Sequence, residues 1–360
     1  MNKSDTAHFR ENYGQYIRQK ILIIVILAVL TFLAALFALC NGSVDIPTIE
    51  VLKALLRFEV EKSVMVTLGV RMPRVYMAII SGIGLALAGY SMQSILKNPM
   101  ASASTLGISQ GATFGAAIAI TYFGAGKIIA NTSDAVTISN PIFTSICAFI
   151  GSMVVTFVIL GLSKYRKTTP PMMILAGVAL SSLFSGATTL LQYFSTDTQM
   201  SAIVFWTFGD LGRVNMKEVG IVVFVTSLSF AYFLFNSWNY NSLESGEDTA
   251  RGLGVHVSRV RLTSMVIASL NTAIIVSFVG TINFIGLIAP HIVRRFIGND
   301  YRYLLPASAF MGALLLIMSD TFARLIISPV ILPIGAITSF LGAPLFLYLI
   351  YKGAGSHAKS

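Results

Sequence analysis

Histidine and cysteine, the side chains that most often form zinc and other transition-metal sites, are few in this chain and lie far apart. The sequence holds four histidines, His8, His256, His291 and His357, and two cysteines, Cys40 and Cys147. No histidine stands near another one, near a cysteine or near a group of carboxylates, so we expect neither a metal site nor a catalytic site. Both cysteines lie in apolar runs, where a cysteine is usually a small buried hydrophobic side chain. A membrane-embedded enzyme would need a catalytic cluster, and the sequence offers none.

The histidine of the stretch FIGLIAPHIVRR allows two interpretations. An ionisable group inside a membrane is a candidate for proton coupling. His291 lies only three residues before Arg294, however, so it can instead have a structural role near the end of a helix. We favour the structural role, and we expect Pro290 to kink that helix.

The elements that carry these residues are predicted to span a membrane. Hydrophobic residues make up 55% of the chain and charged residues 11%, whereas soluble domains carry about 25% charged residues. Charge-free runs longer than the roughly 18 residues that a spanning helix needs cover 21–44, 75–96, 98–126, 135–163, 168–196, 219–243, 262–293 and 325–351. A ninth run, 303–319, is marginal with 17 residues. Strand-like alternation is absent, so we predict an all-α integral membrane protein.

The run 262–293 decides the number of spans. Its 32 residues are many for one span and few for two, and Gly280 in its middle is a suitable break. With a single span there, nine crossings leave 12 Lys and Arg residues inside and 13 outside. With a turn near Gly280 and a short returning helix, ten crossings place 16 inside and 9 outside, in agreement with the positive-inside rule. We therefore predict ten spans.

This topology places both termini in the cytoplasm of a cell-membrane protein. Residues 1–20 are polar and basic ahead of the first apolar run, which is a signal-anchor pattern. Residues 21–352 form the predicted ten-helix transmembrane domain, and residues 353–360 form a cytoplasmic tail. Arg294 and Arg295 then end the short returning helix at the cytoplasmic face.

A glycine pattern indicates one place of close helix packing. Gly107, Gly111 and Gly115 recur every fourth residue on one helical face, which lets two helices approach closely. The neighbour is either a helix of the same subunit or a helix of a second subunit, and we favour the first alternative.

Eight stretches, taken in order, resemble the FecCD family, the permease subunits of ATP-binding-cassette (ABC) importers for iron–siderophores, haem and vitamin B12. They are RMPR at 71–74, KNPMASASTLGISQGA at 97–112, ILAGVAL at 174–180, GEDTARGLGV at 246–255, GTINFIGLIAPHIVR at 280–294, LLPASAFMGALLL at 304–316, SDTFARL at 319–325 and LPIGAITSFLGAPLF at 332–346. The resemblance runs from about residue 20 to about residue 352. In the last block Ile331 stands where the family often has an acidic residue, so a carboxylate at the outer mouth is not expected there.

The resemblance implies a type II ABC importer permease fold with ten helices per subunit, the number reached from charge. It also implies a dimer of permeases, either two copies of this chain or two sister chains, with a translocation path between them. The chain has no GxxxxGK[ST] motif, and GAGK at 124–127 has the wrong spacing to bind a nucleotide. We therefore expect no enzymatic activity and no cofactor in this chain, with ATP and Mg²⁺ bound by two partner ATPase subunits. The other partners implied are an extracytoplasmic substrate-binding protein and membrane lipid, and no nucleic acid.

Residues 242–255, SLESGEDTARGLGV, are predicted to form a short cytoplasmic helix bounded by two glycines. A solvated connection is the alternative. The resemblance implies that this coupling loop packs into a groove of the ATPase, with Ala250 and Gly254 where the surfaces meet. The ATPase-coupling residues are then Gly246, Glu247, Ala250, Arg251, Leu253 and Gly254.

Arg71, Arg74 and Arg324 are predicted to lie on the outer face, where the positive-inside rule disfavours them. They could contact lipid phosphates or cap helix ends. The resemblance implies instead that they form outer sockets that receive acidic residues of the binding protein.

The translocation path is expected to be lined by small polar side chains. The candidates are Ser181, Ser182, Ser185 and Thr189 in one span, together with Asn98, Pro99, Pro290 and His291. The hydroxyl groups could also bond back to carbonyls of their own helix.

The cargo implied by the resemblance is a ferric siderophore, with vitamin B12 or haem as alternatives. A secondary transporter driven by an ion gradient would need inverted repeats and acidic residues within spans. Asp320 is the only acidic residue near the body of a span, and it lies at the outer end. An importer permease is therefore the better interpretation.

Overall fold

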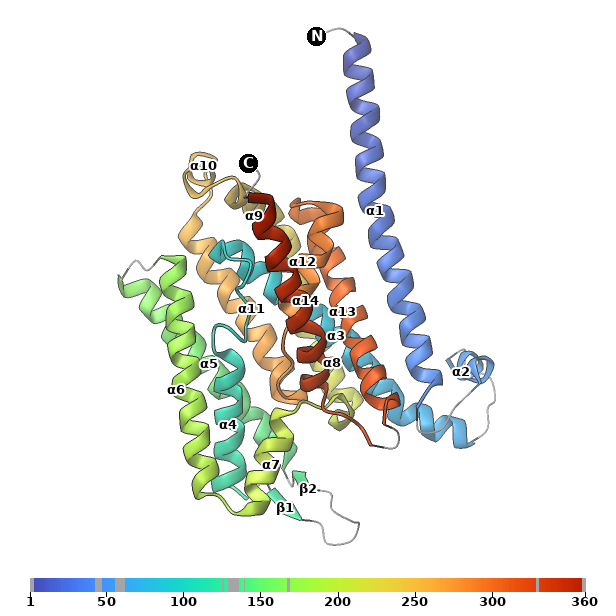
Figure 1. Cartoon of the computed structure of the whole chain (residues 1–360), viewed down its shortest axis with the longest axis vertical. Coiled ribbons are helices and arrows are strands. Elements are labelled where there is room, and N and C mark those ends of the chain that lie inside the picture. The colour runs from blue at the N-terminus through green and yellow to red at the C-terminus, as the bar shows by residue number, and fades with distance from the viewer. Residues whose placement is uncertain are drawn as a thin grey trace.

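A computed structural model of the chain describes residues 3–42, 47–55, 62–124, 126–128, 136–138, 140–166, 169–327 and 330–357. These residues form a bundle of long helices (Figure 1). In order, the elements are α1 (Lys3–Cys40), α2 (Thr48–Leu55), α3 (Lys62–Leu96), α4 (Ile108–Tyr122), β1 (Gly126–Ile128), β2 (Val136–Ile138), α5 (Pro141–Arg166), α6 (Pro170–Phe194), α7 (Asp197–Thr207), a short 3₁₀ helix (Leu211–Arg213), α8 (Met216–Phe235), α9 (Ser237–Glu244), α10 (Glu247–Gly252), α11 (Val257–Val279), α12 (Ile285–Ile297), α13 (Tyr301–Leu325) and α14 (Ile334–His357).

Seven of the described helices, α1, α3, α5, α6, α8, α11 and α13, are long and apolar enough to cross a membrane. The shorter apolar helices α4 and α12 and the apolar part of α14 run beside them, so the bundle contains the ten predicted spans within the described part of the chain. The helix α1 begins, and α14 ends, at the end of the bundle that carries α9 and α10 (Figure 1). We call this the α10 end, and the opposite end, which carries α2, α7 and the β1–β2 hairpin, the α7 end.

The turn predicted near Gly280 is present. The helix α11 stops at Val279, and Gly280 has φ of 79°, a left-handed conformation that favours glycine. Phe284, with φ of 67°, caps α12, which returns over 13 residues and has Pro290 in its body. The sequence FIGLIAPHIVRR is therefore a short returning helix, as its charges indicated.

For two predicted spans the structure shows why the helix and the charge-free run have different bounds. In the run 98–126 the helix covers only Ile108–Tyr122, because hydroxyl groups of the preceding segment bond to its own backbone instead. Thr105 Oγ1 accepts from the Ser102 amide at 2.8 Å and donates to the Ser102 carbonyl at 2.9 Å. The marginal run 303–319 lies within the 25-residue helix α13. That helix extends through Asp320 because the carboxylate is paired there.

The predicted fold is all-α, and the described residues add one small hairpin. β1 and β2 pair antiparallel, with Lys127 opposite Thr137, at the α7 end. The polar N-terminal segment does not form a separate unit, because α1 begins at Lys3 and continues into the first span.

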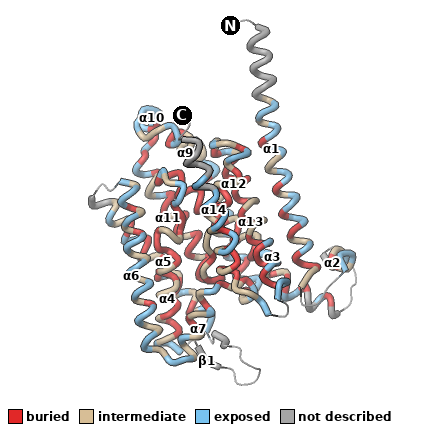
Figure 2. The backbone as a smooth tube through the Cα atoms, viewed as in Figure 1, coloured by how far each residue is buried: buried red, intermediate tan, exposed pale blue. Residues whose placement is uncertain are grey.

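The core lies around α3, which packs against α13, α11, α12 and α8. Figure 2 shows buried residues along α3, α11 and α13, and a largely exposed α6. Two glycine contacts bring the backbones of α3 and its neighbours together. Gly82 faces Gly312 of α13, and Gly89 faces Gly286 of α12, so closely that a Cβ atom at any of the four positions would overlap the opposite backbone.

The glycine pattern of α4 also serves packing within the subunit. A Cβ atom on Gly111 would lie 2.6 Å from the Gly151 carbonyl oxygen of α5, and one on Gly115 would overlap the backbone of Cys147. Gly107, with φ of 81°, instead faces Gly177 of α6. The free cysteines behave as expected of apolar packing residues, Cys40 being buried and Cys147 partly buried.

Candidate functional site

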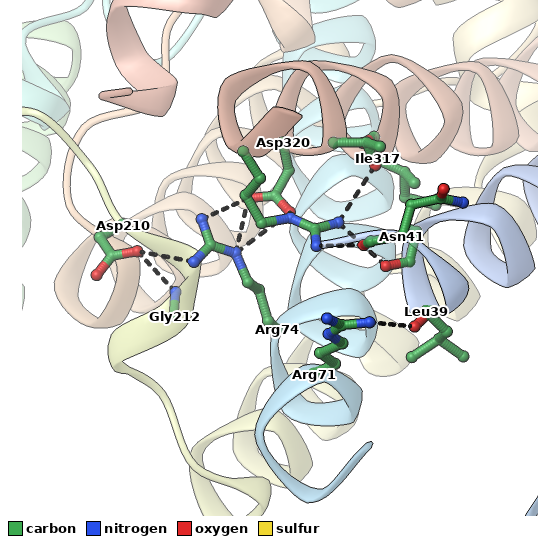
Figure 3. A network of polar contacts seen from close by, with 11 residues as sticks. Leu39, Asn41, Arg71, Arg74, Asp210, Gly212, Ile317 and Asp320 are labelled. Carbon is green, nitrogen blue, oxygen red and sulfur yellow. Dashed lines mark hydrogen bonds and ion pairs between the residues drawn. The ribbon is translucent and has the colours of Figure 1, made fainter. Parts of the chain in front are cut away.

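The predicted docking residues and the predicted coupling residues lie at opposite ends of the bundle. At the α7 end the docking residues belong to a buried ion network (Figure 3). Asp320 of α13 accepts hydrogen bonds from Arg74 Nε at 2.9 Å and from Arg324 Nε at 3.0 Å. The side chain of Asp320 is 2% exposed, that of Arg74 12% and that of Arg324 8%. A buried carboxylate between two arginines is a charge-assisted cluster whose members depend on each other.

Arg324 and the third predicted docking residue, Arg71, donate hydrogen bonds to the carbonyl groups at the end of α1. Arg324 donates to the carbonyl oxygens of Ala38 at 3.2 Å and Asn41 at 3.0 Å, and Arg71 donates to those of Leu39 at 2.9 Å and Cys40 at 3.2 Å. The last carbonyls of a helix have no partner within the helix. The helix-capping alternative therefore describes both residues well.

In this structure the arginines turn toward acceptors of their own chain. Asp320 supplies the acid that the socket prediction assigned to a binding protein. The exposed carboxylate of the network is Asp210, which is 46% exposed and lies 3.8 Å from Arg74. The docking role of Arg71, Arg74 and Arg324 stays a prediction. The i, i+4 spacing of Asp320 and Arg324 was the sequence signal for their pairing.

At the α10 end, α9 is fixed to the bundle by stacked tyrosines. The rings of Tyr90, Tyr301 and Tyr240 stack with centroids 4.6 and 4.3 Å apart, and join α3, α13 and α9. The Tyr240 hydroxyl lies 2.5 Å from that of Ser264 on α11. The side chain of Asn241 accepts from the Tyr301 amide at 2.8 Å. The helix α9 is therefore attached to three spanning helices, α3, α11 and α13.

The helix α10 projects beyond α9 and is joined to α11 by ionic contacts. Glu247 pairs with Arg261, whose Nε donates at 3.2 Å to the Ile95 carbonyl at the end of α3. Arg251 lies 3.5 Å from the same carboxylate. The turns on either side contain Gly246 (φ 121°) and Gly254 (φ 82°), where a side chain would be strained.

The predicted coupling loop thus contains the expected short helix, but Ala250 is not at its surface. The Ala250 side chain is fully buried within the subunit, because it belongs to the core cluster beneath α10. Gly254 and Arg251 are exposed, and Leu253 is an exposed apolar side chain at 57%. Leu253 and its exposed neighbours therefore form the outer surface of this loop, and Ala250 packs the loop against the core.

The helix α6 presents polar side chains on an uncovered face. Ser182, Ser185 and Thr189 are exposed and lie at spacings of three and four residues, so they share one side of the helix. Thr189 donates to the Ser185 carbonyl at 3.1 Å, and the half-buried Ser181 donates to the Gly177 carbonyl at 2.8 Å. The Thr189 hydroxyl is therefore bonded to a carbonyl of its own helix while the side chain stays exposed, so the two alternatives do not exclude each other.

The remaining path candidates lie near the α10 end, away from this stripe. Asn98 and Pro99 line a cavity of about 290 Å³ together with Glu244 and Arg294. Pro290 is buried in α12 and His291 is half-buried beside it. The structure thus groups Asn98 and Pro99 with the coupling helices, and His291 with the basic end of α12. Within the described residues no group of three or more His, Cys, Asp or Glu side chains could hold a metal ion.

Comparisons with known proteins agree on the identity of this fold. The model of the FecCD transport family matches residues 27–352. A protein of Methanocaldococcus jannaschii described as an ABC transporter permease is 49% identical over 95% of this chain and 97% of its own length. The hemin transport system permease of Yersinia pestis is 34% identical over 79% of this chain and 83% of its own. The vitamin B12 import system permease of Vibrio vulnificus is 31% identical over 94% and 96%.

A solved structure extends the match to three dimensions. It is described as an inward-facing conformation of a metal-chelate type ABC transporter, and it is 29% identical to this chain. The alignment has a TM-score of 0.78 and covers 92% of this chain and 99% of the other. The chain is therefore a multi-pass membrane protein that belongs to the FecCD family of ABC importer permeases.

Proposed function

We propose that this chain is the membrane-spanning part of an importer that carries a ferric siderophore into the cell. It would act with a second permease subunit, two ATPase subunits and an extracytoplasmic binding protein. The observation that supports this best is the unit of α9 and α10. It projects from one end of a bundle whose sequence has no nucleotide-binding motif, yet it is fixed to three spanning helices.

The α10 end is the cytoplasmic end in this proposal. The ten crossings place 16 Lys and Arg residues at that end and 9 at the other, as the positive-inside rule requires. The α7 end, with the Asp320 network, then faces the binding protein. Exposed Asp210 and the surfaces around it would make the first contact there.

Closure of the ATPase subunits would push on Leu253 and the exposed side of α10. The ion pair between Glu247 and Arg261 and the tyrosine stack would pass this displacement to α3, α11 and α13. Since the bundle is closely packed, it would respond by tilting helices as units.

The polar face of α6 would line the path between two subunits. Hydroxyl groups facing lipid would gain nothing there, whereas hydroxyl groups facing water or a cargo can bond to it. The exposed residues Ser182, Ser185 and Thr189 suit a path that binds its cargo weakly and releases it.

The choice of cargo rests on similarity. The solved relative is described as a metal-chelate transporter, and other relatives are named for haem and vitamin B12. A ferric siderophore is the proposed cargo, with haem and vitamin B12 as the alternatives. The test is uptake into proteoliposomes that contain the whole complex, with each of the three cargoes on its binding protein. ATP-dependent uptake of a different cargo would overturn the choice of siderophore but not the permease role.

A pair of variants tests the coupling role. Leu253→Asp places a charge on the exposed apolar contact, so we expect the protein to insert normally and uptake to be lost. The matched control is Ser258→Asp, because Ser258 is exposed at the N-terminal turn of α11, where a carboxylate is favourable. Full uptake by Leu253→Asp would contradict the assignment of this loop.

A further inference from the structure

A groove on the side of the bundle, near the α7 end, is built differently from the proposed path. It lies over α11 between α5 and α8, which both pack against α11. Its volume is about 520 Å³, and six of its lining residues are large apolar side chains: Ile142, Ile146 and Phe149 of α5, Ile221 of α8, and Ile274 and Phe278 of α11. The hydroxyl group of Ser277 in its wall donates to the Ile274 carbonyl at 2.8 Å. Ser145 is the other small hydroxyl side chain of the lining. Below its mouth the groove is therefore mostly apolar, which suits an apolar chain.

The mouth of the groove is polar and lies where α8 begins. It is formed by Asn215, Lys217 and Glu218. The carboxylate of Glu218 accepts from the Asn215 amide at 2.8 Å in a capping box, and Asn215 Oδ1 accepts in return. The Lys217 ammonium makes no hydrogen bond or ion pair with any described residue, so it is free to bind an anion.

A second cation stands beside the mouth. Arg213 lines a small adjoining cavity that shares Ser145, Glu218 and Phe278 with the groove. Within the described part of the chain its guanidinium has no hydrogen bond and no ion pair. The acid closest to it in sequence, Asp210, is engaged elsewhere: it lies 3.8 Å from Arg74 and accepts from the Gly212 amide at 2.8 Å. Burial lowers the pKa of Arg213, although Asp210 opposes this. An arginine remains protonated in proteins, so a half-buried guanidinium of this kind favours an external anion.

The surface around the groove is suited to hydrocarbon. On α5 the exposed side chains beyond it include Ile150, Val154 and Phe157, and on α8 they include Phe224 and Leu228. No stripe of hydroxyl groups like that of α6 accompanies them. The groove therefore opens onto a face that matches the acyl region of a bilayer, with its two cations at the level where headgroups lie.

We propose that this groove is a binding site for one anionic glycerophospholipid, with an acyl chain between α5 and α8 and its phosphate between Arg213 and Lys217. Guanidinium and ammonium groups both bind phosphate. A chain inserted over α11 would lie between α5 and α8, which pack on α11 more than on each other. The site is separate from the path and does not depend on the cargo.

The test uses the full chain, purified from vesicles of equal parts phosphatidylglycerol and phosphatidylcholine, and counts retained lipids by native mass spectrometry. We expect wild type to retain one phosphatidylglycerol. Ile274→Trp, which fills the groove, should lose it. Arg213→Gln with Lys217→Gln should still admit a chain but reduce the preference for phosphatidylglycerol over phosphatidylcholine about tenfold.

Matched controls separate the site from general effects. Ile150→Trp adds the same ring on α5 outside the groove, and Lys53→Gln removes an exposed charge at the same end. Both should retain lipid like wild type. Equal retention by Ile274→Trp and Ile150→Trp would overturn the proposal. So would a disulfide between two copies through Ile146→Cys in a cysteine-free background, because a second copy would then occupy the groove.

Discussion

The buried carboxylate of Asp320 is predicted to be essential for the stability of the α7 end. The change Asp320→Asn keeps the shape of the side chain and removes its charge. Arg74 and Arg324, whose side chains are 12% and 8% exposed, would then lose their common counter-ion. Removing one member of a buried ion pair costs about 3–5 kcal/mol. Because Arg324 keeps two carbonyl acceptors and Arg74 keeps Asp210 at 3.8 Å, we expect the lower end, about 3 kcal/mol.

The assay is the free energy of unfolding of the purified protein in detergent micelles, with loss of helical circular dichroism as the signal. The matched control is Asp210→Asn, the same chemical change in the same network. Asp210 is 46% exposed and lies 3.8 Å from its ion-pair partner Arg74, and an asparagine side chain can still accept from the Gly212 amide, so the loss there should stay within about 1 kcal/mol.

A double variant tests the cause. If surplus buried charge is what destabilises Asp320→Asn, then adding Arg324→Met should recover part of the loss, because only Arg74 remains to be compensated and it can still reach Asp210. Equal stability of Asp320→Asn and Asp210→Asn would refute the reasoning. A further loss in the double variant, equal to the sum of the two single losses, would refute the charge explanation.

Two further predictions concern the topology and the acid response. In a cysteine-free variant, a cysteine at Ser133, a residue outside the described part of the chain, should react with an impermeant reagent from outside, and one at Ser163 only from inside; the reverse pattern would overturn the orientation. Burial tends to raise the pKa of Asp300, but hydrogen bonds from Arg302 and Asn241 outweigh it and hold that pKa below 3.8. The ionised carboxylate therefore stabilises the fold above pH 3.8 and this contribution is lost as the pH falls through the lowered pKa, so unfolding midpoints should drop with acid more steeply in wild type than in Asp300→Asn.

Long apolar runs and the placement of charge were sufficient to predict the bundle. The Lys and Arg count required a turn near Gly280 and a short returning helix, and the structure has both. A bilayer makes this possible, because it penalises every unsatisfied backbone group and every misplaced charge along the chain itself. The eight ordered blocks were likewise sufficient for the family.

The first and last residues of single helices were harder to predict from the sequence. The segment before Ile108 is apolar enough to span, yet its hydroxyl groups and the left-handed Gly107 keep it out of the helix. Asp320 interrupts a charge-free run, yet α13 passes through it. In both places a hydrogen bond or ion pair overrides hydropathy.

Only the tertiary structure decided what the site residues touch. The sequence by itself put three arginines on one face and identified α10 as a short helix between glycines. It could not reveal that Asp320 lies between Arg74 and Arg324, or that Ala250 points into the core while Leu253 points out. These facts depend on helices distant in the chain meeting at particular rotations. Helix rotation follows from packing, such as the contacts of Gly82 with Gly312 and of Gly89 with Gly286, which no local pattern of residues specifies.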